Sequence, residues 1–198
     1  MRAMADTPAP PVGREPRWLD PQEQRTWRAY LLATQLLHEQ FERDLQRCAR
    51  MPHAYYEILV RLSEAPGRTI RMSELADRLR SSRSRLSHAV ARLEDAGWVR
   101  RESCPSDRRG ALAVLTDRGF AALGAAAPAH VESVRTHLFD QLTPAQLDQL
   151  RTISETLLEH LAASLELDPA GCPTADTAVE PRNALVGAAA GQEVEGVR

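Results

Sequence analysis

Residues 72–116 read MSELADRLRSSRSRLSHAVARLEDAGWVRRESCPSDRRGALAVLT, and this stretch decides the fold. Apolar residues recur at helical spacing in SELADRLR and again in RSRLSHAVARLEDAG, which predicts two short helices joined by a tight turn. Ser73 and Ser82 are suited to cap them, because a serine hydroxyl accepts from a free backbone N–H of the first turn. Gly97 is expected to end the second helix. The helix pair at 73–96 is therefore typical of a DNA-reading module.

The second predicted helix has two different faces. Leu86, Val90 and Leu93 fall on one stripe, which should face the core. The opposite face carries small and positively charged side chains and has no acidic residue before Asp95. Such a face suits a major groove. The candidate DNA-binding residues on this helix are Ser82, Arg83, Ser84, Arg85, Ser87, His88 and Arg92.

Residues 98–115 are predicted to form a two-stranded wing. WVRRESC and ALAVL have the character of strands, and PSDRRG between them supplies turn residues. Arg108 and Arg109 can reach phosphates or a minor groove, whereas Asp107 is expected to brace the loop by pairing with an arginine. These three residues are the candidate DNA-binding residues of the wing. The short segment from Arg68 to Arg71 could pair with the wing as a third strand.

The stretch SDRRGALAVLTDRG resembles the wing signature of the MarR (multiple antibiotic resistance regulator) family, an Asp-x-Arg core followed by Leu-Thr-x-x-Gly. RSRLSHAVARLEDAGWVRR is similar to the recognition helix and wing entry of that family, and the flanking helices agree in order and length from about Asp20 to Leu167. Two departures are Gly110, where the family more often has Ala or Ser, and Cys104 just before the loop.

The resemblance implies a mainly α fold with a small β wing, in which long helices from both ends of a winged helix-turn-helix domain form a dimer. It also implies a homodimeric regulator of transcription that binds double-stranded DNA, represses from an inverted-repeat operator and is released by a small-molecule effector. The family often binds phenolic or lipophilic effectors, so the aromatic residues Trp27, Tyr30, Tyr55 and Tyr56 are candidates for lining an effector pocket. Core packing explains Trp27 and Tyr30 equally well.

The flanking segments contain the signals of long helices. Asp20-Pro21-Gln22-Glu23 and Thr143-Pro144-Ala145-Gln146 each place a capping residue before Pro and a Glu or Gln three positions later. The first helix, 20–50, would be about 45 Å long, which exceeds what a winged helix can cover. The last helix carries an apolar seam that includes Leu150 and Leu157. We expect both seams to be buried against a second subunit.

The predicted organisation follows from these signals. A further helix should begin at Thr116 and run to about Leu142, with Pro128 kinking or interrupting it. The proline-rich N-terminus and the Ala-, Gly-, Pro- and Thr-rich C-terminus are expected to be disordered. The segments are an arm at 1–18, a domain at 19–167 made of dimerisation helices at 20–50 and 117–167 around a winged helix-turn-helix at 51–116, and a tail at 168–198.

Charge is distributed unevenly along the chain. The formal net charge of the 198 residues is only −2, yet the stretch from Arg68 to Arg109 holds eleven arginines and six acidic residues. This stretch is therefore +5 and the rest of the chain −7. A basic centre in an acidic protein is the electrostatic pattern of a nucleic-acid reader.

The three cysteines are Cys48, Cys104 and Cys172, and they form no C-x-x-C pair, which argues against a disulfide framework and a thiolate zinc site. A thiol redox-sensing regulator that uses Cys48 or Cys104 is an alternative interpretation, weighed against ordinary reduced thiols. No N-terminal stretch has the apolar core of a signal peptide, and none is apolar enough to span a membrane. A cytoplasmic protein is expected.

Other classes of function find little support in the sequence. His130 and His137 share a helical face, and a metal site with His160 or His38 is one interpretation. A core or surface role is favoured because soft ligands are not nearby. Phosphate-loop, dinucleotide-binding, H-E-x-x-H and G-x-S-x-G motifs are absent, so we expect neither an enzyme nor a cofactor. The remaining alternative is a winged-helix protein-interaction module without DNA binding, in which exposed apolar residues would replace the basic face.

Overall fold

The computed structural model describes residues 16–104 and 107–165 of the chain. Most of the expected N-terminal arm at 1–18 lies outside the described residues, and the expected tail at 168–198 lies outside them entirely. The chain divides into two compact units, Met1–Leu36 and Leu37–Arg198. Helix α1, Pro21–Ala49, begins in the first unit and ends in the second.

The described part of the first unit is residues 16–20 and the start of α1. Asp20 caps the helix, because its Oδ1 accepts from the backbone N–H groups of Gln22 at 2.6 Å and Glu23 at 2.8 Å. Glu23 Oε2 accepts in return from the N–H of Asp20 at 2.8 Å, so the capping box expected from the sequence is confirmed. The large apolar side chains exposed in this unit are Trp18, Leu19, Trp27, Tyr30, Leu31, Leu32 and Leu36.

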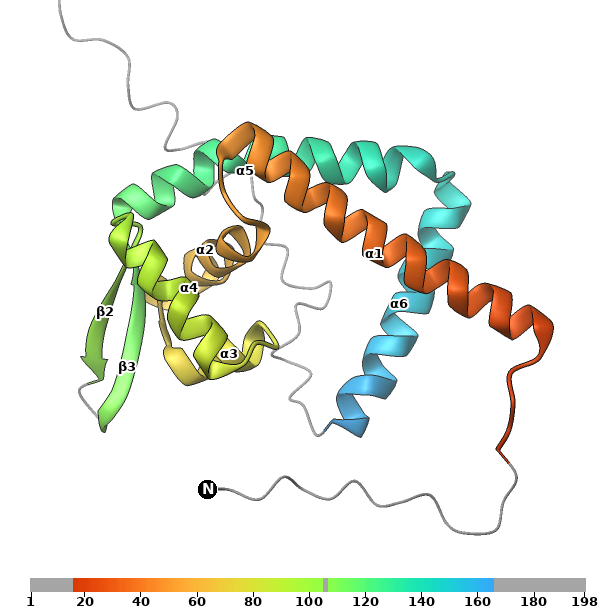
Figure 1. The fold of residues 1–198 in the computed structure, drawn as a ribbon, viewed down its shortest axis with the longest axis horizontal. Coiled ribbons are helices and arrows are strands. Elements are labelled where there is room, and N and C mark those ends of the chain that lie inside the picture. Colours follow the sequence, from red (N-terminus) through yellow and green to blue (C-terminus); the bar gives the residue numbers. More distant parts are fainter. Residues whose placement is uncertain (1–15, 105–106, 166–198) are drawn as a thin grey trace, which may run out of the picture. The chain divides into compact units, whose positions relative to one another are not determined.

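The second unit contains the remaining helices and one small sheet (Figure 1). Its elements are α2 (His53–Glu64), the 3-10 turn η1 (Pro66–Arg68), β1 (Thr69–Arg71), α3 (Met72–Arg78), α4 (Arg83–Asp95), β2 (Val99–Cys104), β3 (Asp107–Leu115), α5 (Asp117–His137), the 3-10 turn η2 (Phe139–Gln141) and α6 (Pro144–Ser164). A mainly α fold with a small β wing was expected from the sequence and is confirmed.

The sheet is antiparallel in the order β1-β3-β2. Ile70 of β1 pairs with Ala113, and Val99 of β2 pairs with Leu115, so β3 is the central strand. The third strand expected near Arg68–Arg71 is therefore present. β1 lies between α2 and α3 in the chain and pairs with β3 of the hairpin. This pairing anchors the wing to the α2–α3 region of the core.

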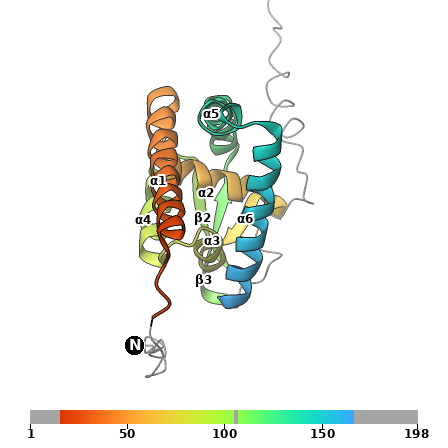
Figure 2. The same cartoon turned by 90° about the vertical axis from the view of Figure 1, so that its right-hand side faces the viewer.

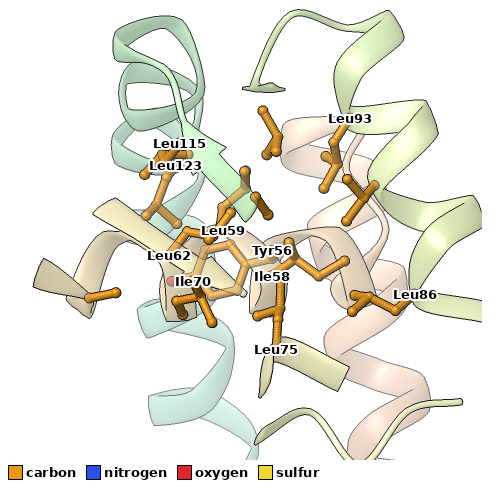
Figure 3. Close-up of a cluster of buried hydrophobic side chains, with 14 of the residues drawn as sticks. Tyr56, Ile58, Leu59, Leu62, Ile70, Leu75, Leu86, Leu93, Leu115 and Leu123 are labelled. Carbon is orange, nitrogen blue, oxygen red and sulfur yellow. The ribbon is translucent and has the colours of Figure 1, made fainter. Parts of the chain in front are cut away.

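Apolar side chains from α2, α3, α4 and the sheet meet in one core (Figure 3). Leu59 and Leu62 of α2 and Leu75 of α3 are fully buried, and the α4 stripe of Leu86, Val90 and Leu93 is at most 2% exposed. The expectation that this α4 stripe faces inward is confirmed, and it fixes which side of α4 remains accessible.

Two expectations about helix starts and ends were wrong. Ser73 does not cap the first helix of the pair: α3 begins at Met72, directly after β1, and its capping position is Arg71, with no side-chain hydrogen bond. The end of the strand thus sets the start of the helix, and Ser73 lies inside the first turn. The long helix after Thr116 ends at His137, not near Leu142, because Leu138 leaves the helical region at φ −126° and ψ −68°.

Pro128 was expected to kink or interrupt α5. It does not interrupt the helix, because Asp117–His137 is one continuous helix with Pro128 inside it. The residues in the turn before it, Gly124–Ala127, are all small, which leaves room for the proline ring against the preceding turn. Thr116 caps α5 by accepting from the N–H of Gly119 at 3.0 Å, as predicted. Figure 2 views α5 nearly end on, with α6 extending away from its end.

Helix α6 is poorly buried. Thr143 and Gln146 form the predicted capping box at its start, but of its 21 residues only Ala162 is buried. The exposed apolar residues of α6 and the residue after it are Leu150, Ile153, Leu157, Leu161 and Leu165. This apolar face has the spacing of a helix–helix contact and is open in the described chain. No helix within the described residues is long and apolar enough to cross a membrane.

Candidate nucleic-acid interface

Local interactions fix both ends of α4. Ser82 Oγ accepts from the backbone N–H of Arg85 at 3.2 Å, which is the N-cap expected from the sequence. After Asp95 the chain turns through Gly97, whose φ of 72° lies in the region that favours glycine, and the N–H of Trp98 bonds to the carbonyl of Leu93 at 2.9 Å. The turn at Gly97 therefore ends α4 and leads directly into β2, which begins at Val99.

The outward face of α4 is as accessible as the sequence predicts. Ser82, Arg83, Ser84, Arg85, His88 and Arg92 are exposed, and Ser87 is half-buried. Among the described residues, the side chains of Arg83 and Arg85 have no hydrogen-bonding or ion-pair partner, since Arg85 bonds to Ser82 only through its backbone N–H. Arg92 reaches only the exposed Asp95, at 3.8 Å. The guanidinium groups of this face are thus available to an external acceptor.

The wing is a hairpin with an irregular outer end. Ser103 pairs with Ala111, but the next residue, Cys104, pairs with Asp107. Residues 108–110 of β3 therefore have no counterpart on β2, which makes a bulge. The predicted turn at 105–110 was too long, because antiparallel pairing extends β3 outward to Asp107. The structure describes the backbone of Asp107, Arg108 and Arg109 but not their side chains, so their expected contacts stay predictions.

A groove of about 450 Å³ lies between α4, the start of α3 and the hairpin. It is lined by Arg71, Met72, Ser73, Arg83, Ser87, Arg101, Gly110 and Ala111. Three arginines from three different elements line it, and sequence reasoning named only Arg83 among them. Arg71 and Arg101 were missed because the strand register, which the sequence does not state, brings them to the groove.

A smaller cavity of about 170 Å³ adjoins the turn between α3 and α4. Its lining is mixed in polarity and consists of Ala54, Glu57, Ile58, Leu79, Arg80, Ser81, Arg85, Leu86 and Ala89. Neither cavity is lined by Trp27, Tyr30, Tyr55 or Tyr56, the candidates for an effector pocket.

The four aromatic candidates differ in their surroundings. Trp27 and Tyr30, on the first part of α1, are each 51% exposed and stack with their ring centroids 6.4 Å apart. Tyr55 of α2 is half-buried and packs on the core. Tyr56 is buried, and that burial raises the pKa of its hydroxyl to about 12. Lining of a common pocket by these residues stays a prediction.

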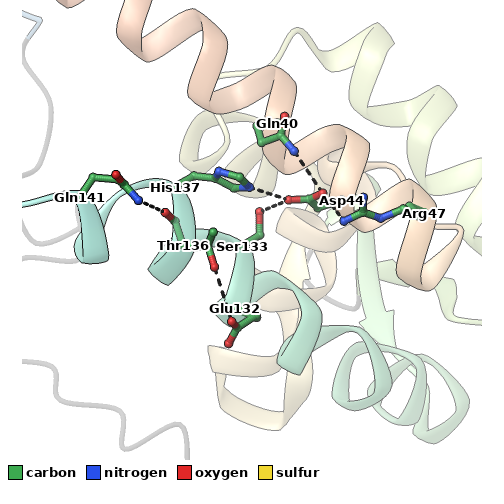
Figure 4. A network of polar contacts seen from close by, with 8 residues as sticks. All are labelled: Gln40, Asp44, Arg47, Glu132, Ser133, Thr136, His137 and Gln141. Carbon is green, nitrogen blue, oxygen red and sulfur yellow. Dashed lines mark hydrogen bonds and ion pairs between the residues drawn. The ribbon is translucent and has the colours of Figure 1, made fainter.

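A buried polar network joins α1 to α5 (Figure 4). Asp44 Oδ2 accepts from Ser133 Oγ at 2.7 Å and lies 3.1 Å from His137 Nε2, while its Oδ1 accepts from Arg47 at 2.8 Å and Gln40 at 3.2 Å. The hydrogen bond from Ser133 lowers the pKa of the Asp44 carboxyl, and the other three partners act in the same direction against desolvation. Through Asp44 the network links the side chains of α1 to Ser133 and His137 of α5.

The histidines considered for a metal site lie in different environments. The His130 ring lies tilted against Tyr56 and His53, with ring centroids 4.5 Å and 5.6 Å away. Its buried Nδ1 has no hydrogen-bond partner among the described residues. Desolvation, followed by the neighbouring His53, lowers the pKa of His130. His137 belongs to the Asp44 network. Within the described residues, no group of three or more potential ligands could hold a metal ion.

The two cysteines of interest also differ. Cys48 is exposed near the end of α1, and Cys104 is buried at the outer end of β2. Neither forms a disulfide within the described residues, and Cys104 is only 5% exposed. A buried thiol is a poor target for oxidants, so this placement does not favour the redox alternative at Cys104.

Comparison with known proteins shows which family this chain resembles. The family model described as MarR family matches residues 51–110. Sco3205 of Streptomyces coelicolor, a MarR family transcriptional regulator solved in complex with DNA, is 54% identical, with a TM-score of 0.70 over 74% of this chain and 92% of that chain. AbsC of the same organism, also a MarR family transcriptional regulator, is 47% identical, with a TM-score of 0.69 over 75% of this chain and 99% of that chain.

A curated relative agrees with the two solved structures. The HTH-type transcriptional regulator PecS of Dickeya dadantii (strain 3937) is 33% identical over 89 residues, which are 45% of this chain and 53% of that protein. The matched region thus spans about half the length of the curated relative. From the family model and the extent of the match to Sco3205 and AbsC, the chain belongs to the MarR family of winged-helix transcriptional regulators.

Proposed function

We propose that the protein regulates transcription by binding double-stranded DNA in a sequence-specific manner, with α4 in a major groove and the β2–β3 hairpin against the neighbouring backbone and minor groove. The observation that carries this proposal is the outward face of α4, where the side chains of Arg83 and Arg85 are exposed and have no partner among the described residues. Clustered guanidinium groups bind phosphates and guanine edges. The complex of Sco3205 with DNA supports the same role for a 54% identical relative.

The protein is further proposed to act as a homodimer on an inverted repeat. The apolar face of α6, which includes Ile153 at 57% exposed and Leu161 at 51%, needs a partner to leave water. The exposed apolar residues at the start of α1 have the same need. A second copy of the chain is the simplest partner, because in a two-fold dimer the same apolar face of each subunit covers that of the other. Two-fold symmetry in the protein then requires two-fold symmetry in the operator.

Repression with release by a small-molecule effector is the finer part of the proposal. It is supported by family membership, and Trp27, Tyr30, Tyr55 and Tyr56 remain the proposed pocket residues. Once an effector is found, Tyr55→Phe and Trp27→Phe should weaken its action on DNA binding. An unchanged effector response in both variants would remove these residues from the proposal.

The test of the main proposal is footprinting on the DNA upstream of the protein's own gene, followed by titration of the protected duplex and a scrambled duplex of equal length. We expect a protected inverted repeat and tighter binding to it than to the scrambled duplex. A preference of at least about a thousand-fold is typical of specific regulators. Equal affinity for both duplexes would contradict sequence-specific regulation.

A further inference from the structure

Glu94 is an acidic residue in the last turn of α4, and its carboxylate holds β2 at two atoms. Glu94 Oε2 accepts from the guanidinium Nε of Arg101 at 2.5 Å, and Oε1 accepts from the backbone N–H of the same residue at 2.8 Å. The side chains are about one third exposed, 30% for Glu94 and 34% for Arg101. The contact is therefore partly shielded from water and fixes backbone as well as side chain.

This contact lies where the hairpin leaves the core. Val99, at the start of β2, is 2% exposed and belongs to the core, whereas Glu102 and Ser103 beyond Arg101 are exposed. β2 is an edge strand of the sheet, so its outer N–H groups have no strand partner. Glu94 satisfies one of them, and in doing so ties the hairpin to the helix that carries the outward basic face.

We propose that Glu94 is a positioning residue that sets the wing at the angle to α4 needed for both elements to engage DNA together. The proposal rests on DNA binding by α4 and the wing, as argued above. Glu94 adds a negative charge near the phosphates, so as a mere surface residue it would oppose binding. If Glu94 nevertheless favours DNA binding, the benefit must come from how it holds the wing. Removal of Glu94 should therefore weaken DNA binding if Glu94 positions the wing, and strengthen it if Glu94 acts only through its charge.

The adjacent residue provides a matched control. Asp95 carries the same charge on the same helix turn, but its side chain is 74% exposed and its ion pair with Arg92 spans 3.8 Å. It has no contact with β2 among the described interactions. Removal of the Asp95 charge should therefore report the electrostatic effect alone.

The experiment titrates the footprinted operator at several salt concentrations with the full-length parent and the variants E94A, E94Q, D95A, R109A and E94A/R109A. We expect E94A to weaken binding by about five-fold and to reduce the slope of log affinity against log salt by about one, as if one wing contact were lost. D95A should bind as tightly as the parent or more tightly. E94Q should fall between E94A and the parent, because its amide oxygen still accepts from the Arg101 N–H.

The double variant tests whether Glu94 acts through the wing. If R109A already removes the wing contact, E94A should cost nothing more in that background, so E94A/R109A should bind no more weakly than R109A. Thermal melting and sedimentation confirm that each variant is folded and assembled like the parent. Should E94A unfold, the nearly isosteric E94Q decides in its place.

The possible outcomes separate the two proposals. An E94A protein that binds more tightly, as D95A does, overturns the positioning role while DNA binding by the parent stands. Additive losses in E94A/R109A overturn it as well, because Glu94 would then act independently of the wing. A parent protein without specific DNA binding overturns the proposed function and the positioning role together.

Discussion

Arg85 and Arg92 lie on the exposed face of α4, and their removal should damage sequence reading. A bidentate contact with guanine lost in Arg85→Ala or Arg92→Ala should cost about 1–3 kcal/mol on the operator and much less on unrelated DNA. Titrations of the footprinted and scrambled duplexes measure the difference. Arg151→Ala on α6, whose side chain is 60% exposed, is the control for loss of one arginine. If both variants bound DNA like the parent, this face of α4 would not read DNA, and a winged-helix module that binds another protein would become the favoured alternative.

Arg109 belongs to the wing, so its removal should have a different signature. Arg109→Ala is expected to weaken operator and unrelated DNA to a similar extent, because phosphates and a minor groove carry little base information. The slope of log affinity against log salt should fall by about one for each lost phosphate contact. A loss confined to the operator, with the slope unchanged, would show that Arg109 reads bases.

Asp44 predicts how stability depends on pH. Because its pKa in the folded protein lies below the ordinary value of 3.8, the network stabilises the fold above that value and is lost as pH falls through the lowered pKa. Asp44→Asn should lower the free energy of unfolding near pH 7 by about 1–3 kcal/mol, with a smaller difference in acid. Urea unfolding at both pH values measures this, with the 76% exposed Asp148→Asn as control. An offset equal at all pH values would exclude titration of Asp44 as the cause.

At the scale of elements, α6 tests assembly. Leu150→Asp with Leu157→Asp should abolish the dimer and specific DNA binding together, because charges would replace the apolar face that a second copy is proposed to cover. Sedimentation at micromolar concentration and operator titration measure the two effects. Thr152→Asp, at an exposed position on the other side of the helix, should leave both unchanged. A monomer that still binds the operator with parent affinity would contradict the proposed dimer.

Elements with strong local signals could be predicted from the sequence. The caps at Asp20, Ser82, Thr116 and Thr143 and the apolar stripe of α4 all appear where expected, because each depends on residues within a few positions of one another. This also applies to the exposure of the α4 basic face. The family resemblance added the expected roles of the flanking helices, which local patterns do not encode.

Features that depend on pairing between distant segments could not be predicted. Ser73 has the chemistry of a cap, but the sheet decides where α3 starts, since β1 runs directly into it. The positions of Arg71 and Arg101 in the groove depend on the register of β1 and β2 against β3. Asp44 and Ser133 lie 89 positions apart, and no spacing rule connects them. The contact of Glu94 with β2 likewise depends on the path of the chain through Gly97.

For the whole molecule, the distribution of charge along the chain matters more for the encounter with DNA than the net charge does. The stretch from Arg68 to Arg109 is +5 while the rest of the chain is −7. DNA therefore attracts one region and repels the remainder, which favours encounters that present α4 and the wing. The effect should weaken as salt screens charges beyond roughly 10 Å at 0.1 M. This electrostatic orientation brings the recognition elements to DNA but does not choose a sequence.

The proposed symmetric dimer predicts that affinity for the operator depends on the spacing between the two half-sites. Two recognition helices related by a two-fold axis should meet half-sites about one helical turn, roughly 34 Å, apart on one side of the duplex. Insertion of about five base pairs at the centre of the operator turns one half-site by roughly half a turn, so only one recognition helix can bind. The affinity should then fall to nearly that of a single half-site, whereas central substitutions that keep the length should have smaller effects, through duplex shape alone. Titration of these duplexes, with the stoichiometry measured by sedimentation, tests the prediction. If the lengthened operator and the single half-site both bind like the natural site, each subunit reads DNA alone and the two-fold arrangement is wrong.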